Sequence, residues 1–414
     1  MDDPAFALPN PIDENTQTIL LHASQHNLAA LKPLLRIPGN ASVQDPETGF
    51  TPLHAAIAAC EEDDDPESEV VDIEKAKDVV RELFMSGAIW NDVDVLRDET
   101  PGCLAWRLGR RELYGLCVEA GVRAEMLLGI MGRYEALESS DEGEEEEEKG
   151  DVMESETNGH TAEGVQAIGE EGEEKKDVNS ADYLASDLKF EDDKLLDADA
   201  NGVMMAWETD IMRRSVDLLL PAQQEGGAKP RILNIGFGMG IIDRMFAATN
   251  PHSHHIIEAH PAVLEKLAAA DSDFGSAWEE SAPEGGRYVV HKGKWQDVLP
   301  GLLESGAVFD VIYFDTFGED YSALKEFFSE FVPGLLDENG RFGFFNGLGA
   351  DRRVCYDVYT RVAELDLSEA GLEVEWTDVP IGELGGEGEG EWKGVRRRYW
   401  TLDTYRLPIC SFLA

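Results

Sequence analysis

The hydrophobic positions in the second half of the chain form short apolar runs that alternate with longer amphipathic stretches. The runs predict buried strands at 232–235, 255–258, 288–291, 309–314 and 341–345. Helical patterns are clearest at 212–220, 322–331 and 351–365. Alternating strands and helices predict an α/β fold with a mainly parallel sheet. Two last strand-like stretches, 372–379 and 398–407, have no helix between them and predict an antiparallel hairpin at the edge of that sheet.

Residues 15–135 show a different pattern, because short helical stretches follow one another without strands. The segment that begins at Thr51 reads T-P-L-H-A-A and matches the T-P-L-H-x-A signature of ankyrin repeats. Weaker copies occur at 18–35 and from Thr100 onward. We expect about three irregular ankyrin-like repeats, in which His54 has a structural role. Such repeats usually bind proteins through a concave face, although here they could simply pack on the second domain.

The stretch at 136–180 separates these two patterns. It contains acidic runs such as Glu144–Glu148 and few large apolar residues, a composition that predicts a disordered linker. The chain is therefore expected to consist of ankyrin-like repeats at 15–135, an acidic linker at 136–180 and an α/β domain at 181–414.

The overall charge narrows the choice of partners. The chain has 84 acidic residues against 35 Lys and Arg residues, a formal net charge of −49. This disfavours binding to nucleic-acid phosphates and would attract a basic protein, although acidity could also confer solubility alone. No apolar run reaches the roughly 18 residues that span a bilayer, and the first residues do not resemble a secretory signal. We expect a monomer in the cytoplasm and nucleus, with no membrane and no nucleic acid among its partners.

The cysteines indicate no metal. The five cysteines, Cys60, Cys103, Cys117, Cys355 and Cys410, form no C-x-x-C pair and have no metal-ligand spacing. Scattered cysteines of this kind suit a reducing compartment. We therefore expect no structural or catalytic metal ion.

The candidate site begins at the turn after the first strand of the α/β domain. Residues 231–243 read R-I-L-N-I-G-F-G-M-G-I-I-D, with three glycines at alternate positions. Glycine lets a ligand approach the backbone closely, and the following helix offers free N–H groups. The G-x-G-x-G spacing departs from the G-x-G-x-x-G of dehydrogenases, which disfavours a nicotinamide cofactor. A tight turn without any ligand remains the alternative.

Two acidic residues follow later strands of the same sheet. Glu258 lies 18 positions after Gly240, where a Rossmann-type fold places a carboxylate on ribose hydroxyls. Asp315 directly follows the run at 309–314. Because ligands bind outside the carboxyl ends of parallel strands, we expect the glycine turn, Glu258 and Asp315 to line one crevice. The sequence contains no H-E-x-x-H or Walker motif that would indicate a metalloprotease or a P-loop enzyme.

Five segments of the α/β domain resemble, in order, those of guanidinoacetate methyltransferase and of its relative, the fungal type IV protein arginine methyltransferase. They read M-M-A-W-E-T, N-I-G-F-G-M-G-I-I-D, I-I-E-A-H-P, G-K-W-Q-D and F-D-T-F, and the resemblance covers about residues 180–414. The repeats and the acidic linker favour the arginine enzyme. The resemblance implies a class I S-adenosylmethionine-dependent methyltransferase that modifies the δ-nitrogen of arginine in a basic, ribosomal protein. Small-molecule guanidino methylation and a catalytically idle module that binds a basic protein remain alternatives.

The resemblance also assigns roles to individual residues. Glu208 and Asp315 match the two carboxylates that hold the guanidino group; alternatively, Glu208 is a helix N-terminal charge and Asp315 a helix cap. Ala206 departs from the pattern, because the small-molecule enzyme has a bulkier basic residue there. The residues expected to bind the cofactor, from its methionine part to its ribose and adenine, are Tyr183, Met212, Phe237, Gly238, Met239, Gly240, Ile241, Ile242, Glu258, Ala259, His260, Trp295, Gln296 and Asp315.

The chemistry of a guanidinium group suits a pair of carboxylates. The group stays protonated in water, with a pKa above about 12, and its nitrogen lone pairs are delocalised. Two carboxylates accept hydrogen bonds from it in a planar fork. If Glu208 and Asp315 hold the two terminal nitrogens, the internal nitrogen is left available for the methyl group, and a carboxylate can take its proton.

Overall fold

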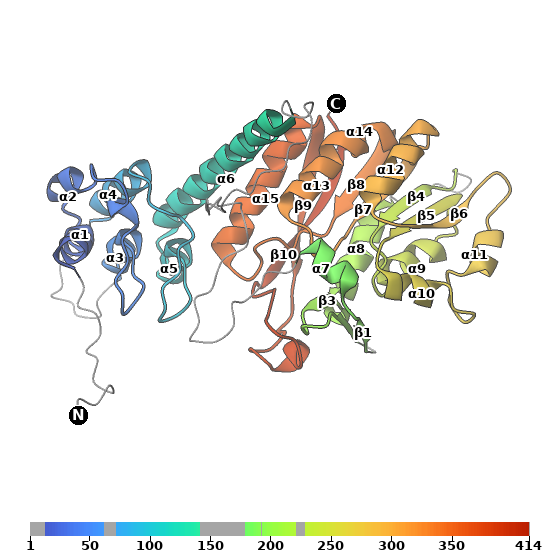
Figure 1. Cartoon of the computed structure of the whole chain (residues 1–414), viewed down its shortest axis with the longest axis horizontal. Helices are drawn as coiled ribbons and strands as arrows, with labels where there is room; N and C mark the ends of the chain where they lie inside the picture. The colour runs from blue at the N-terminus through green and yellow to red at the C-terminus, as the bar shows by residue number, and fades with distance from the viewer. Residues whose placement is uncertain (1–12, 62–71, 141–178, 192, 221–227, 414) are drawn as a thin grey trace, which may run out of the picture. The chain divides into compact units, whose positions relative to one another are not determined.

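The structure is a computed structural model that describes residues 13–61, 72–140, 179–191, 193–220 and 228–413. The chain divides into two compact units, one formed by residues 1–177 with 352–362 and the other by residues 178–351 with 363–414. Figure 1 shows the helical N-terminal part in blue to teal and the α/β part in green to red. Across the described ranges, no helix is both long enough and apolar enough to cross a membrane.

Helices form the N-terminal part of the first unit. In chain order they are α1 Glu14–Ser24, α2 Leu28–Leu34, α3 Pro52–Ala58, α4 Ile73–Met85, α5 Pro101–Arg107 and α6 Arg111–Ser140. Most of the linker predicted at 136–180 lies outside the described residues, although α6 continues to Ser140.

The T-P-L-H segment starts helix α3 by local hydrogen bonding. The Thr51 hydroxyl accepts the N–H of His54, and Nδ1 of His54 accepts the N–H of Thr51 in return. The His54 ring is fully buried, with Nε2 3.0 Å from the carbonyl oxygen of Glu99. Thr100 caps α5 in the same manner, through the N–H of Cys103. These contacts give His54 a structural role.

The second unit is organised around a sheet. Within the described residues it has seven strands in the order β6-β5-β4-β7-β8-β10-β9. The strands are β4 Arg231–Ile235, β5 Ser253–Glu258, β6 Tyr288–Lys292, β7 Phe309–Phe314, β8 Leu336–Phe344, β9 Leu372–Pro380 and β10 Thr404–Phe412. Neighbours from β6 to β8 pair in parallel, whereas β10 pairs antiparallel with β8 and β9. The predicted parallel sheet with an antiparallel hairpin at its edge is therefore confirmed.

Helices cover both faces of this sheet (Figure 1). The helices of the second unit are α7 Ser180–Ala185, α8 Thr209–Leu219, α9 Ile241–Ala248, α10 Pro261–Leu267, α11 Ser276–Glu280, α12 Trp295–Glu304, α13 Tyr321–Glu326 and α14 Val332–Leu335, and α15 Arg353–Glu369 runs from the first unit into the second. Successive residues of β4 face opposite layers: Ile232 packs with α8 and α9, and Leu233 with α12, α13 and α14. A strand buried on both faces explains the apolar residues Ile232, Leu233 and Ile235, and the buried Asn234 between them donates to Gly236 and Asp243.

Two predicted elements differ from the observed ones. The last strand starts at Thr404 rather than 398; Trp400 lies before it and packs against Trp207 and Tyr405 with ring centroids 5.8 and 5.6 Å apart. The helix predicted at 322–331 is α-helical only to Glu326 and continues as a π-helical segment, Phe327–Phe331.

A small antiparallel sheet was not predicted. Its strands are β1 Lys189–Phe190, β2 Lys194–Leu196 and β3 Gly202–Met205. A 3₁₀ turn, Ala206–Glu208, follows β3 and leads directly into α8. The small sheet thus places Met204 and Glu208 beside the ends of the larger sheet's strands.

Candidate active site

The turn after β4 requires glycine. Gly236 has φ +91°, and an added Cβ would lie 1.9 Å from the carbonyl oxygen of Asp315. Gly240 has φ +68°, and an added Cβ would lie 2.3 Å from the Phe237 ring. Side chains at these positions would therefore clash or strain the backbone. The absence of side chains lets the turn pack against the segment that carries Asp315.

Glu258 at the end of β5 holds this turn through hydrogen bonds. Its carboxylate is nearly buried and accepts the N–H groups of Phe237 at 3.0 Å and Gly238 at 3.3 Å through Oε2. Oε1 accepts the N–H of His260 at 2.6 Å. A carboxylate has about four acceptor positions, so about one remains for a ligand hydroxyl. Glu258 thus holds the turn and also lines the adjoining pocket.

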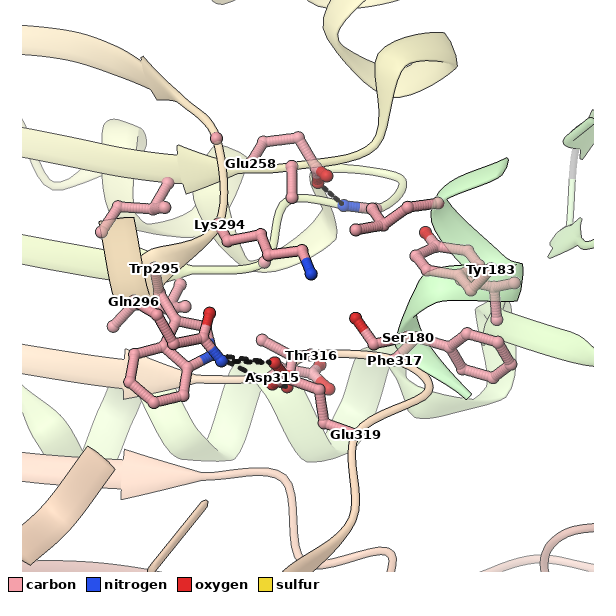
Figure 2. Close-up of a pocket in the computed structure, with 18 of the residues that line it drawn as sticks. Ser180, Tyr183, Glu258, Lys294, Trp295, Gln296, Asp315, Thr316, Phe317 and Glu319 are labelled. Carbon is pink, nitrogen blue, oxygen red and sulfur yellow. Dashed lines mark hydrogen bonds between the residues drawn. The ribbon is translucent and has the colours of Figure 1, made fainter. Parts of the chain in front are cut away.

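A pocket with about 630 Å³ of empty space, part of it continuous with solvent, lies at the carboxyl ends of the strands (Figure 2). Seven of the predicted site residues line it: Tyr183, Gly238, Glu258, Ala259, Trp295, Gln296 and Asp315. Residues that were not among the predicted site residues also line it, including Ser180, Met204, Lys294, Thr316, Phe317 and Glu319. The structure therefore brings the glycine turn, Glu258 and Asp315 into one crevice.

The other predicted cofactor residues lie behind the pocket wall. Met212, Ile241 and Ile242 pack in or against the core cluster between the sheet and helices α8 and α9. Phe237 packs on Phe274 with ring centroids 5.3 Å apart. Their side chains support the turn, and only its backbone reaches the pocket.

Met239 and His260, which were also predicted to bind the cofactor, form hydrogen bonds with residues that line the pocket. The N–H of Met239 donates to the sulfur of Met204, which lies against Gly238. His260 caps α10 through Nδ1, and its Nε2 lies 3.0 Å from the carbonyl oxygen of Tyr183. His260 therefore positions the Tyr183 wall of the pocket.

Three side chains in one wall of the pocket donate hydrogen bonds to Glu319. Its carboxylate accepts Trp295 Nε1 at 3.0 Å, Gln296 Nε2 at 3.1 Å and the Thr316 hydroxyl at 2.6 Å. Sequence reasoning missed Glu319, because its partners lie up to 24 positions away.

Glu208 is buried, and Asp315, which is half-buried, acts electrostatically on its carboxylate. Glu208 is 4% exposed, and its carboxylate accepts the Tyr399 hydroxyl and the N–H of Met205. Burial, with the negative charge of Asp315 as a second cause, raises the pKa of Glu208 to about 8. Burial also raises the pKa of Asp315 to about 7, although part of its surface faces the pocket. Glu208 itself does not line this pocket.

The structure also bears on the alternative roles of these carboxylates. The cap of α13 is Asp320, which accepts the N–H groups of Ser322 and Ala323, so Asp315 does not cap that helix. Glu208 precedes α8, but its side chain makes no capping hydrogen bond to α8. Glu208 keeps the alternative role of a charge at the N-terminus of α8, and its carboxylate forms a capping box in the preceding 3₁₀ turn by accepting the N–H of Met205.

Aromatic side chains surround Glu208. Trp207 lies 6.0 Å from Tyr399 and 5.8 Å from Trp400 between ring centroids, and Trp392 lies 5.0 Å from Tyr399. Trp392, Tyr399 and Trp400 come from the segment before β10, which the sequence pattern assigned partly to a strand, whereas Trp207 lies in the 3₁₀ turn beside Glu208. Such surroundings exclude water and explain the raised pKa of Glu208.

Comparison with known proteins identifies the family. The family model of guanidinoacetate N-methyltransferase matches residues 165–347. The protein arginine N-methyltransferase 2 of Gibberella zeae is 56% identical, covering 94% of this chain and 91% of its own length. Those of Neurospora crassa and Aspergillus fumigatus are 56% and 46% identical and cover 96% and 100% of this chain. The chain belongs to the protein arginine N-methyltransferase 2 family.

Membership of the protein arginine N-methyltransferase 2 family makes the chain an enzyme, an S-adenosylmethionine-dependent arginine N-methyltransferase. This confirms the resemblance found in the sequence. Solved structures match far less closely. Spermidine synthase of Thermotoga maritima is 14% identical, with a TM-score of 0.33. The match covers 54% of this chain and 71% of the synthase chain. That similarity supports no conclusion about this chain.

The pocket suits the cofactor of this enzyme class. The Oε1 atom of Gln296 is buried and has no hydrogen-bond partner among the described residues, so it can accept from a ligand. Glu258 keeps about one acceptor position for a hydroxyl. The glycine turn, where Gly238 lines the pocket, leaves room for close approach. The acceptors of Glu258 and Gln296, which both line the pocket, match the hydroxyls and the amino group of an adenosyl ligand.

Proposed function

We propose that this enzyme transfers a methyl group from S-adenosylmethionine to the δ-nitrogen of arginine in a basic, ribosomal protein. The observation that carries the proposal is the two carboxylates with raised pKa values: Asp315 lines the pocket that suits the cofactor, and Glu208 is buried near it. When bound, S-adenosylmethionine supplies an electrophilic methyl group on its sulfonium. The residues of the chain must then bind the arginine, orient it and take up a proton.

The two carboxylates need a cation. Removing an anion from water is costly unless it is paired, and the raised pKa values of both groups express this cost. Among the described residues, no Lys or Arg forms an ion pair with Glu208 or Asp315. A guanidinium group would supply the missing charge and lower both pKa values. The carboxylates, unpaired among the described residues, thus support a planar cation from the substrate as their partner.

The same pair explains how a nitrogen could become nucleophilic. Two carboxylates can hold the two terminal nitrogens of the guanidinium in a fork, which leaves the δ-nitrogen unclamped. When the N–C bond forms, that nitrogen must lose its proton. A carboxylate with a pKa near 7 is a better base than an ordinary one, because its pKa lies close to the working pH. We assign catalytic roles to Glu208 and Asp315 on this basis.

The N-terminal part is proposed to recognise the protein substrate. The capped starts of α3 and α5 support the interpretation of this part as ankyrin-like repeats, which commonly bind proteins. The net charge of −49 favours a basic partner. We also propose that the enzyme acts as a monomer in the cytoplasm and nucleus.

A second candidate is methylation of a small guanidino compound, because the matching family model is that of guanidinoacetate N-methyltransferase. The full chain, supplied with methyl-labelled S-adenosylmethionine, would be offered ribosomal proteins or guanidinoacetate in separate reactions. We expect label in protein and none in guanidinoacetate. Label in the small molecule alone would favour the second candidate, and label in neither would contradict both candidate substrates.

A further inference from the structure

Glu319 is the centre of a hydrogen-bond network that the catalytic roles above do not use. It accepts hydrogen bonds from Trp295 and Gln296 at the start of α12 and from Thr316 after β7. Figure 2 shows these side chains side by side along one wall of the pocket. The network therefore connects the segments that follow two strands, β6 and β7.

The network decides which way the amide of Gln296 points. An ionised carboxylate can only accept hydrogen bonds, and an amide has a donor side and an acceptor side. With Glu319 on one side, the NH₂ group of Gln296 must face it, at 3.1 Å. The carbonyl oxygen, Oε1, is then directed away from Glu319, and it is buried without a partner among the described atoms. A buried acceptor without a donor is costly, so a ligand in this pocket is expected to supply one.

We propose that Glu319 is a positioning residue that fixes the Gln296 amide, so that its carbonyl oxygen accepts from the exocyclic amino group of the cofactor's adenine. This inference rests on the proposed use of S-adenosylmethionine. Adenine carries a donor, the amino group, where the deaminated base hypoxanthine carries an acceptor oxygen. Two acceptors facing each other leave both unpaired. The fixed amide therefore selects an adenosyl ligand against its deaminated analogue.

The test compares two ligands on the full chain by titration calorimetry: S-adenosylhomocysteine and its deaminated analogue, S-inosylhomocysteine. The unmodified protein should bind the adenosyl thioether at least about tenfold more tightly. In Glu319→Gln, the new amide can donate to Gln296 Oε1, so the Gln296 amide is free to turn and the ratio of the two affinities should fall toward one. The matched control is Glu330→Gln, the same chemical change at an exposed residue of the π-helical segment, and it should keep the ratio.

A second variant covers the case in which Glu319→Gln does not fold. Gln296→Leu removes the acceptor and should also bring the ratio toward one. A folded Glu319→Gln or Gln296→Leu protein that keeps the full ratio would overturn the inference. Equal affinity of the unmodified protein for both thioethers would overturn it as well, while leaving the proposed function intact. Failure to bind either thioether would instead contradict the proposed cofactor itself, and the inference with it.

Discussion

Replacing Glu208 by Gln should lower activity and raise stability at the same time. The Gln side chain has nearly the same shape, and its carbonyl oxygen can still accept the N–H of Met205. Its NH₂ group can donate to Tyr399, whose hydroxyl hydrogen is free to rotate. The variant should therefore keep the local fold. It loses only the negative charge that the substrate cation needs.

The expected gain in stability follows from the raised pKa of Glu208. A buried carboxyl whose pKa is raised from 4.5 to about 8 contributes stability that is fully present below pH 4.5 and is lost as the pH rises to about 8. The difference between these pKa values corresponds to a loss of roughly 5 kcal/mol above pH 8. Gln does not titrate, so the free energy of unfolding of the variant should exceed that of the parent increasingly between pH 4.5 and 8.

The assay combines three measurements on each protein. Urea unfolding at pH 5 and pH 8.5 should show no gain for the variant at the lower pH and a gain of a few kcal/mol at the higher pH. Methyl transfer to an arginine peptide should fall by roughly two orders of magnitude or more, because the substrate nitrogen is no longer oriented. The affinity for S-adenosylhomocysteine should hardly change. Near-normal turnover, or a variant less stable than the parent at pH 8.5, would refute the reasoning.

Three further predictions concern the site and the fold. Asp315→Asn should reduce turnover as Glu208→Gln does. The double variant should be little worse than either single one, since the effects of residues that act as a unit are not additive. Additive losses of turnover in steady-state assays would show independent roles. Glu258→Ala should weaken S-adenosylhomocysteine binding by at least about tenfold in calorimetry, and an unchanged affinity would remove its cofactor role. Gly121→Ala should lower the free energy of unfolding by about 1–3 kcal/mol despite the helix preference of Ala, because the added methyl would lie 2.6 Å from a neighbouring side chain. Its control in the same helix, Gly115→Ala, meets nothing within 4 Å and should stabilise by up to about 1 kcal/mol in denaturant melts; equal effects would contradict the packing.

Local patterns predicted the main sheet well. The largely apolar run at 309–314 coincides with β7, because a strand buried on both faces needs apolar residues; its one charged residue, Asp310, is half-buried and pairs with Arg231. The small sheet escaped prediction because its strands have only two to four residues, too few to show an alternation. The start of β10 was placed too early because Trp400 is of a residue type common in strands. In the structure its ring packs against Trp207 and Tyr405.

The candidate site was predictable where it follows from topology. Glu258 is the last residue of β5 and Asp315 directly follows β7, and the carboxyl ends of such parallel strands meet at one edge of the sheet. Tyr399 was not predictable, because it reaches Glu208 across 191 positions of sequence. Glu319 likewise acts through side chains from another segment. Contacts of this kind depend on the whole fold and leave no local pattern.

The central claim is that Glu208 and Asp315 hold the terminal nitrogens of arginine and leave the δ-nitrogen to be methylated. The most direct test is tandem mass spectrometry of an arginine peptide methylated by the full chain, with Asp315→Asn as the inactive control. Fragments that place the methyl group on the δ-nitrogen are predicted. A methyl group on a terminal nitrogen would contradict the proposed arrangement of the two carboxylates.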